Sequence, residues 1–325
     1  MSSEILSGDS FYKLTPDDVL NGVEEAGFMP TGEFQQLNSY ENRVFDVWLE
    51  KDADSNPGQQ TRVIAKFYRP GRWSKLALED EHNFLADLVS EGIHAIAPLK
   101  LRNGSTLMQH NGLFYALFPR FAGRMPQEFL PGELKQVGRT LARIHNIGSR
   151  RPARHRLRMS AEEHGWNQLE DLAPRIDPGL WPRYEKACSL ILEHLDEYLD
   201  EKSFLRIHGD CHKGNLLHAG QEFFFVDFDD FLNGPAAQDF WMLLSGSEAA
   251  EKEEMISGYE ELRDFPDEQL ELFEPLRGLR ILHYAAWISK RWSDPSFPRL
   301  FPEFGTFRYW AEEVEGLEKI AWSLE

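Results

Sequence analysis

The sequence has few cysteines and no long apolar segment, and both absences narrow the class of protein. Cys188 and Cys211 are the only cysteines among 325 residues, too few for a disulfide framework and typical of a reducing compartment. No uncharged run approaches membrane-spanning length, and residues 1–18 lack the apolar core of a signal peptide. We therefore expect a cytoplasmic protein with no membrane partner.

Positive charge is also scarce. The chain has 35 Lys and Arg residues against 54 Asp and Glu residues, a formal net charge of −19, which repels nucleic-acid phosphates and anionic lipid headgroups. We expect no nucleic-acid partner. The hydrophobic content of 42% is enough for a packed core in a chain long enough for two subdomains.

Periodicity and turn signals divide the chain into a sheet-rich part and a helix-rich part. Thr15 is predicted to be the N-cap of a helix and Pro16 its first residue, and this helix is expected to end at about Ala26. Apolar and β-branched runs predict strands at 43–50, 61–69 and 113–119 and an inserted helix at 74–92; from 131 the pattern is helical, apart from short strands at 204–210 and 222–230. We predict an α+β fold with a small antiparallel-sheet lobe, residues 1–121, and a larger, mostly helical lobe, residues 122–325.

The stretch "RIHGDCHKGNLLH" at 206–218 concentrates residues that carry chemistry. In one interpretation, His208, Asp210 and His212 are the metal ligands of a zinc hydrolase. In the other, Asp210 and Asn215 are the base and the metal ligand of a phosphoryl-transfer loop, which they match in spacing. We expect the two histidines to orient Asp210 and the loop backbone, and Cys211 to be a buried apolar residue.

Lys66 lies within the apolar run "VIAKFY". Taken alone, it is as readily an edge-strand lysine that points to water, but a buried ammonium needs an anion. Glu81 falls on the apolar stripe of the 74–92 helix, where a carboxylate needs a cation. We therefore predict an ion pair between Lys66 and Glu81, with Glu79 and Asp80 as the fallback.

Asp227 follows Asn215 by twelve residues, at the end of a predicted strand. Phosphoryl transfer requires a carboxylate for the hydroxyl proton, and an amide and a second carboxylate that hold Mg²⁺ against the phosphates. A lone D-x-x-x-x-N is a weak signal, but the upstream lysine and glutamate strengthen it, and the hydrolase leaves both unexplained. Strand alternation places Asp229 on the side of Asp227, near the first metal or at a second one, and Asp230 opposite, as a turn or cap.

Several long segments resemble one family of enzymes. They are "LNSYENRVF" (37–45), "KFYRPGRW" (66–73), "HGDCHKGN" (208–215), "FVDFDD" (225–230), "NGPAAQDFWMLL" (233–244) and "KRWSDPSFP" (290–298). The chain resembles kinases of the aminoglycoside phosphotransferase and choline kinase type, and most closely the bacterial stress response kinase A family. The resemblance covers nearly the whole chain and implies a two-lobed protein kinase-like fold, with ATP as co-substrate and Mg²⁺ as cofactor.

The resemblance also assigns roles to residues. It implies that Asp210 is the proton acceptor, that Asn215 and Asp227 bind Mg²⁺, and that Ser39 contacts ATP. The chain departs from typical protein kinases because it lacks a G-x-G-x-x-G loop, so "NSYENRV" must cover the phosphates. Asp239 is expected to hold the catalytic loop by hydrogen bonds. Lys66 and Glu81 complete the nucleotide site, and the adenine is expected to meet the backbone around Pro119 and Phe121.

The acceptor is the least determined element. The resemblance implies a serine or threonine hydroxyl of a protein, including the kinase itself, in a stress response, and we expect a monomer. The alternatives are a small-molecule kinase of the same fold, of aminoglycoside, choline or homoserine type, or a nucleotide-binding scaffold without turnover. Seven arginines at 139–158 are interpreted as a solvated segment rather than a nucleic-acid patch; together with Arg277 and Arg280 they could offer a basic rim to peptides with acidic neighbours.

Overall fold

The computed structural model describes residues 11–51 and 61–325, so residues 1–10 of the segment searched for a signal peptide lie outside it. The chain forms two compact units. The N-terminal unit runs to Glu128 and also includes Ala153–Arg156 and Gly214–Asp229; the C-terminal unit comprises Phe129–Pro152, Leu157–Lys213 and Asp230–Glu325. The predicted division after residue 121 did not include the two returns of the chain to the N-terminal unit.

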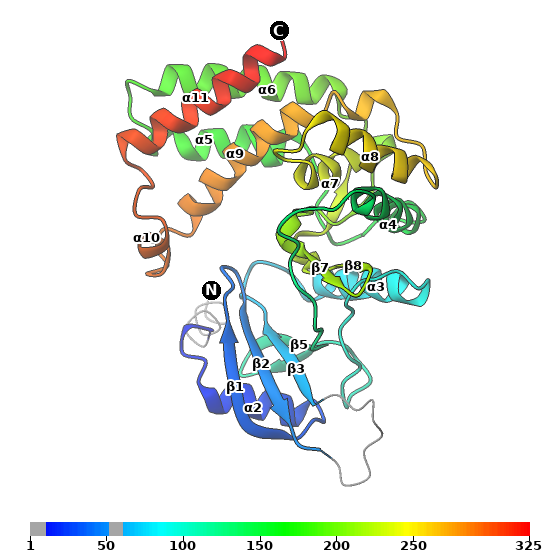
Figure 1. Cartoon of the computed structure of the whole chain (residues 1–325). Coiled ribbons are helices and arrows are strands. Elements are labelled where there is room, and N and C mark those ends of the chain that lie inside the picture. The colour runs from blue at the N-terminus through cyan, green and yellow to red at the C-terminus, as the bar shows by residue number, and fades with distance from the viewer. Residues whose placement is uncertain (1–10, 52–60) are drawn as a thin grey trace. The chain divides into compact units, whose positions relative to one another are not determined.

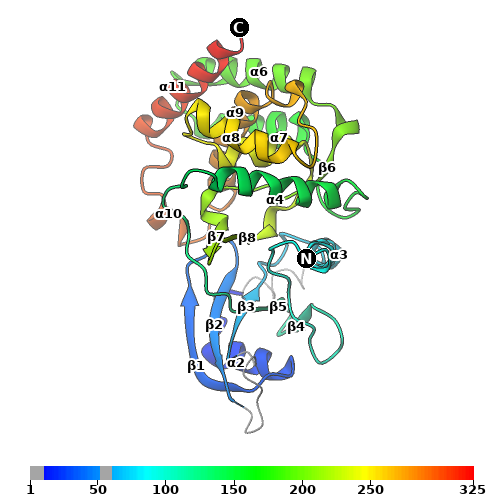
Figure 2. The same ribbon diagram turned by 45° about the vertical axis from the view of Figure 1, so that its right-hand side comes forward.

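The N-terminal unit is built on a five-stranded antiparallel sheet (Figures 1 and 2). The three predicted strands are confirmed. β1 and β4 were not predicted, because β1 is mostly exposed and polar and β4 is only three residues long. In sheet order the strands are β1 (Pro30–Leu37), β2 (Arg43–Leu49), β3 (Arg62–Phe67), β5 (Leu113–Pro119) and β4 (Met108–His110).

Two helices cover the two faces of this sheet. α2 (Pro16–Glu25) begins at the predicted cap, where Thr15 and Asp18 form a reciprocal capping box, and its buried side chains join one apolar cluster with Val63, Ala65 and Phe67 of β3. α3 (Lys75–Ser90) begins at the predicted Ser74 cap and packs on the other face, next to Ala116. Since strand residues alternate between faces, Lys66, which pairs with Ala116, lies on the α3 face.

The N-terminal unit also contains the hairpin of β7 (Leu216–Ala219) and β8 (Glu222–Phe225). The C-terminal unit is mostly helical, as predicted, and contains one small antiparallel pair, β6 (Leu205–Ile207) with β9 (Leu232–Gly234). Its helices are α4 (Glu133–Gly148), α5 (Asn167–Leu172), α6 (Trp181–Tyr198), α7 (Ala236–Leu243), α8 (Ala249–Glu260), α9 (Phe273–Lys290), α10 (Phe297–Leu300) and α11 (Phe307–Ser323), with a π-helical turn at Glu162–Trp166.

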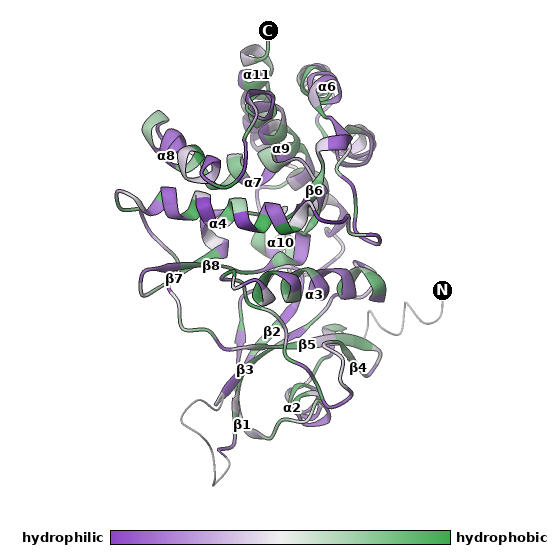
Figure 3. Ribbon diagram, turned by 90° about the vertical axis from the view of Figure 1, so that its right-hand side faces the viewer, coloured by the Kyte–Doolittle hydropathy of each residue, from purple (hydrophilic) through white to green (hydrophobic). Residues whose placement is uncertain are grey.

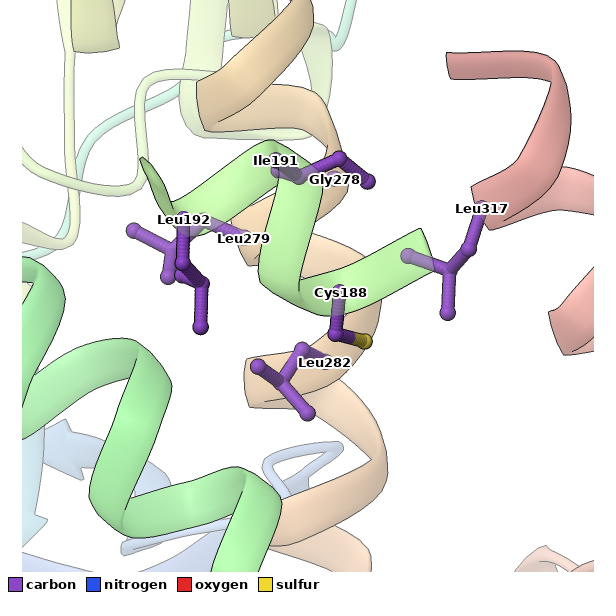
Figure 4. Close-up of a pocket in the computed structure, with 7 residues that line it drawn as sticks. All are labelled: Cys188, Ile191, Leu192, Gly278, Leu279, Leu282 and Leu317. Carbon is purple, nitrogen blue, oxygen red and sulfur yellow. The ribbon is translucent and has the colours of Figure 1, made fainter. Parts of the chain in front are cut away.

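Apolar stripes hold the C-terminal unit together. Along α4, apolar and hydrophilic residues alternate (Figure 3), and the predicted stripe, which includes Leu134, Val137 and Leu141, is buried. Cys188 of α6 lies among leucine and isoleucine side chains of α6, α9 and α11 (Figure 4). Burial raises the pKa of its thiol, which is typical of an unreactive core cysteine. No helix in the described part of the chain is long and apolar enough to cross a membrane.

Candidate active site

Asp210 lies in the loop that follows β6, within the C-terminal unit. Its backbone N–H donates to His208 Nδ1 at 3.3 Å, and its carboxylate lies 3.5 Å from His212 Nε2. Arg280 of α9 contacts the other carboxylate oxygen, with Nη2 at 2.9 Å from Oδ1. The two histidines thus orient Asp210 as predicted, whereas the contact with Arg280 was not anticipated.

The side chain of Asp239, in α7, holds the backbone of this loop by hydrogen bonds. Asp239 accepts hydrogen bonds from the N–H of His208 at 2.8 Å and of Gly209 at 2.9 Å, and it is fully buried. His145 of α4 lies 3.0 Å from the same carboxylate through Nε2. The expected role of Asp239 in holding the catalytic loop is therefore confirmed.

Gly209 is required by the shape of the loop. Its φ of +84° lies in the left-handed region, and a Cβ there would lie 2.2 Å from the carbonyl oxygen of Asp230. A side chain would therefore both strain the backbone and displace the segment that follows Asp229.

The charges around Asp210 keep its carboxylate ionised. Burial alone would raise its pKa, but the hydrogen bond with His212 and the positive charge of Arg280 hold the pKa of Asp210 well below its ordinary value. An ionised carboxylate accepts hydrogen bonds only, so Asp210 is suited to orient a hydroxyl group and to receive its proton as the oxygen reacts.

Lys66 is buried in the N-terminal unit and pairs with two carboxylates. Its Nζ lies 3.0 Å from Asp227 Oδ1 and 3.1 Å from Asp229 Oδ1. Burial alone would lower the pKa of Lys66, but these two carboxylates, together with the field of Glu81, raise it well above its ordinary value. The lysine is therefore held as a cation, as a phosphate-binding group requires.

The predicted ion pair between Lys66 and Glu81 is wrong. Within the residues the structure describes, Glu81 pairs instead with Arg156, whose Nη2 lies 2.5 Å from Glu81 Oε2. Arg156 also donates to the carbonyl oxygens of Ala77 and Asp229 and lies over the ring of Trp73. The apolar stripe correctly indicated a buried carboxylate that needs a cation, but the cation comes from Ala153–Arg156.

Arg156 also corrects the interpretation of the arginine-rich segment. Five of its arginines are exposed, as predicted, and Arg139 is half-buried, but Arg156 is only 5% exposed. The sequence signal that pointed to it was the need of the Glu81 carboxylate for a cation, which did not say which of the seven arginines supplies that cation. In the structure, burial raises the pKa of Glu81 to about 7 although Lys66 and Arg156 lower it.

The carboxylate of Asp229 pairs with more than one cation. Besides Lys66, its carboxylate contacts Arg72 and accepts from Asn42 Nδ2 at 3.0 Å. It is 5% exposed, so its oxygens face protein cations rather than an open metal position. Asp229 does lie beside Asp227 as predicted, but on a 3₁₀ turn, Phe228–Asp230, and not through strand alternation.

The turn at 37–45, which is expected to cover the phosphates, is connected to Asp229 through Asn42. Ser39 Oγ accepts from the N–H of Asn42 at 3.2 Å, and Asn42 Oδ1 accepts from the N–H of Arg69 at 3.1 Å. The side chain of Arg69 donates in turn to the carbonyl oxygens of Glu41 and Tyr40. These bonds give the turn a defined shape without glycines; the contact of Ser39 with ATP remains a prediction.

The segment expected to meet the adenine leaves the sheet at the end of β5. Pro119 pairs with Val63 of β3, and the ring of Phe121 lies 4.1 Å, centroid to centroid, from that of Phe224 in β8. His94 also stacks on Phe224, with ring centroids 4.7 Å apart. Phe224 is an aromatic neighbour that the sequence reasoning missed, and adenine binding by Pro119 and Phe121 stays a prediction.

The chemistry of Asn215 and Asp227 fits Mg²⁺. Both belong to the N-terminal unit, where the N–H of Val226 donates to the carbonyl oxygen of Asn215 at 3.0 Å. Asp227 has a φ of +61°, rare outside glycine, and its side chain is 57% exposed. An exposed carboxylate and an amide are the oxygen donors that Mg²⁺ takes from proteins, with phosphates and water as the other ligands.

The zinc alternative fails on the same geometry. Among residues 11–51 and 61–325, no group of three or more His, Cys, Asp or Glu side chains is placed to hold a metal ion. His208 is fully buried, and its Nδ1 accepts from the loop backbone. Cys211 is buried as predicted, and burial raises the pKa of its thiol well above the ordinary value.

A five-stranded antiparallel sheet with a buried lysine, and a helical unit that presents an ionised aspartate, define a phosphotransferase with a two-lobed kinase-like fold. Residues 33–274 match the phosphotransferase enzyme family. The chain is 37% identical over 311 residues to the serine/threonine protein kinase RdoA of Salmonella typhimurium, covering 94% of this chain and 92% of the relative. It is 36% identical over 314 residues to stress response kinase A of Escherichia coli K12, covering 95% and 93%. The chain belongs to the stress response kinase A family.

Solved structures confirm the fold class. Amicoumacin kinase hAmiN, in complex with AMP-PNP, Ca²⁺ and Ami, matches with a TM-score of 0.71 at 17% identity, over 94% of this chain and 93% of that chain. Spectinomycin phosphotransferase APH(9)-Ia, in complex with ADP and spectinomycin, matches with a TM-score of 0.67 at 14% identity, over 95% and 98%.

Proposed function

We propose that the protein is an ATP- and Mg²⁺-dependent kinase that transfers the γ-phosphate to serine or threonine hydroxyls of proteins, including itself. The observation that carries the proposal is the family membership, combined with an ionised Asp210 on a rigid loop and a cationic Lys66 beside Asp227. The proposal includes a monomeric enzyme in the cytoplasm, where two buried free cysteines would remain reduced.

Each residue has one task in this mechanism. Lys66 binds phosphate oxygens of the nucleotide, and Asp229 holds its ammonium in place. Asn215 and Asp227 would hold Mg²⁺, which when bound neutralises charge on the phosphates. Asp210 orients the acceptor hydroxyl and receives its proton as the oxygen attacks the γ-phosphorus.

The test is phosphate transfer from labelled ATP with Mg²⁺. The purified protein is incubated alone, with casein, with myelin basic protein, and with choline, homoserine or an aminoglycoside; Asp210→Asn serves as the control. Label on serine or threonine that is lost in the variant supports the proposal. Rapid, saturable turnover of a small alcohol without any phosphoprotein would overturn the protein acceptor, and no transfer to any acceptor would overturn the kinase.

A further inference from the structure

One face of α9 combines basic and aromatic side chains. Arg277, Arg280, Tyr284 and Trp287 follow one another at intervals of three, four and three residues, which places them on the same side of a helix. The side chains of Arg277 and Arg280 are 47% and 35% exposed, and Tyr284 is 39% exposed. The face is thus accessible along two turns of the helix.

One end of this face contacts the catalytic carboxylate of Asp210. Arg280 is the residue whose Nη2 lies 2.9 Å from Asp210 Oδ1. Arg277, one turn earlier, pairs with Glu274 on the same helix, with Nη2 at 2.6 Å from Oε2. An exposed pair of this kind contributes little to stability and exchanges readily for another anion.

The other end of the face is aromatic. The rings of Tyr284 and Trp287 stack with centroids 5.4 Å apart, and Phe301 meets Tyr284 edge to face at 6.0 Å. Leu300, the last residue of α10, is 50% exposed. Tyrosine and tryptophan at a surface are typical of sites that bind an apolar side chain.

The two arginines of this face belong to an acidic protein. The net charge of the chain is −19, and two of the arginines at 139–158 that the sequence suggested as part of a basic rim pair with other carboxylates: Arg139 with Glu261 and Arg158 with Glu201. Arg280 places its guanidinium next to Asp210, where an acceptor hydroxyl must lie, and Arg277 lies one turn earlier; Arg280 is paired with Asp210 itself and Arg277 with Glu274. An acidic side chain on the acceptor can replace Glu274 at the exposed guanidinium of Arg277.

We propose that this face of α9 docks the acceptor segment, which carries an acidic residue beside its serine or threonine and an apolar residue about three positions away. The inference rests on the proposed function and names its acceptor class. The spacing follows from geometry: seven residues of helix, from Arg280 to Trp287, span roughly 10 Å, and an extended peptide covers that distance in about three residues. The acidic residue binds Arg277 and shares Arg280 with Asp210.

The test compares three peptides that each contain one serine. The first has an acidic residue next to the serine and a leucine three residues away. The second has lysine in place of the acidic residue, and the third has alanine in place of the leucine. The acidic, apolar peptide is expected to have a kcat/KM about tenfold higher than the lysine peptide. The variants are Arg277→Glu and Tyr284→Ser, with Arg308→Glu on the exposed surface of α11 as the control of equal charge change.

Arg277→Glu is expected to abolish or reverse the preference for the acidic peptide through KM, and Tyr284→Ser to reduce the preference for leucine. Arg308→Glu is expected to keep both preferences. Equal kcat/KM for the acidic and lysine peptides, or an unchanged preference in Arg277→Glu, overturns the docking surface while peptide phosphorylation itself still supports the kinase. Turnover of a small alcohol with no peptide phosphorylated overturns the proposed function and the docking surface together.

Discussion

Glu81 and Arg156 form a buried ion pair across 75 residues of chain, with Arg156 Nη2 at 2.5 Å from Glu81 Oε2. The side chains are 1% and 0% exposed, so neither charge has water as an alternative partner. Because Arg156 also donates to the carbonyl oxygen of Asp229, this pair connects α3 to the turn that follows Asp227. The pair therefore helps to position the turn that contains Asp229, whose carboxylate pairs with Lys66.

Removal of Arg156 should destabilise the fold. Arg156→Met leaves Glu81 buried without its cation, and we expect the free energy of unfolding to fall by about 3–5 kcal/mol, measured by urea denaturation. In double-mutant cycles with Glu81→Gln, the coupling of Glu81 to Arg156 should exceed its coupling to Lys66 by at least about 1 kcal/mol. A larger coupling to Lys66 would restore the pairing first predicted.

The titration of Glu81 should make stability depend on pH near neutrality. Burial raises the pKa of Glu81 from 4.5 to about 7, so between these values the folded protein binds a proton that the unfolded chain has released. Stability from this group is therefore lost as the pH rises from about 4.5 to 7. Urea unfolding at several pH values should show wild type losing stability relative to Glu81→Gln over this range; parallel curves would contradict the shift.

Asp210→Asn should separate the catalytic role from folding. The loop is held by Asp239 through its backbone, so we expect the variant to fold and to keep its ATP affinity, with turnover lowered on the order of a hundredfold or more. Some stability should be lost, because the ionised Asp210 carboxylate contacts Arg280 and its lowered pKa means that its charge stabilises the folded state. ATP affinity is measured by calorimetry and turnover with labelled ATP. Loss of ATP binding with normal turnover of the bound complex would remove Asp210 from its assigned role.

Metal binding should depend on Asp227 more than on Asn215. Asp227 brings a full negative charge to the ion, whereas Asn215 brings a neutral amide oxygen. Calorimetric titration of Mg²⁺ and ATP should therefore show weaker binding in both alanine variants and the larger loss in Asp227→Ala. Equal affinity in wild type and Asp227→Ala would count against the metal site.

The fold class and several local structural features were predicted correctly from the sequence, because these features depend on short-range patterns. The capping residues Thr15 and Ser74 and the strand that carries Lys66 are all local features. β1 was missed because its edge position leaves few apolar residues to reveal it. The face of a helix on which a residue lies was also predicted correctly: Glu81 is on the buried face of α3, and Leu134, Val137 and Leu141 are on the buried face of α4.

Pairing between distant segments could not be predicted in the same way. The stripe on α3 indicated that Glu81 needs a cation, but Arg156 reaches it through a short return of the chain that has no periodic signal. Asp229 was placed beside Asp227 through an alternation that the 3₁₀ turn does not have. Arg280 lies 70 residues after Asp210, and only the packing of α9 brings them together.

The N-terminal unit is assembled from three separate stretches of chain, the last of which ends at Asp229. During synthesis on the ribosome, the sheet and α3 emerge before Arg156 and long before Asp229. Glu81 therefore lacks its cation until nearly half of the chain has been made, and Lys66 lacks Asp229 until most of it has been made. A gene fragment that stops at Glu128 would encode the complete sheet and still omit both partners. The N-terminal unit of this enzyme is therefore not separable as a contiguous piece of its gene.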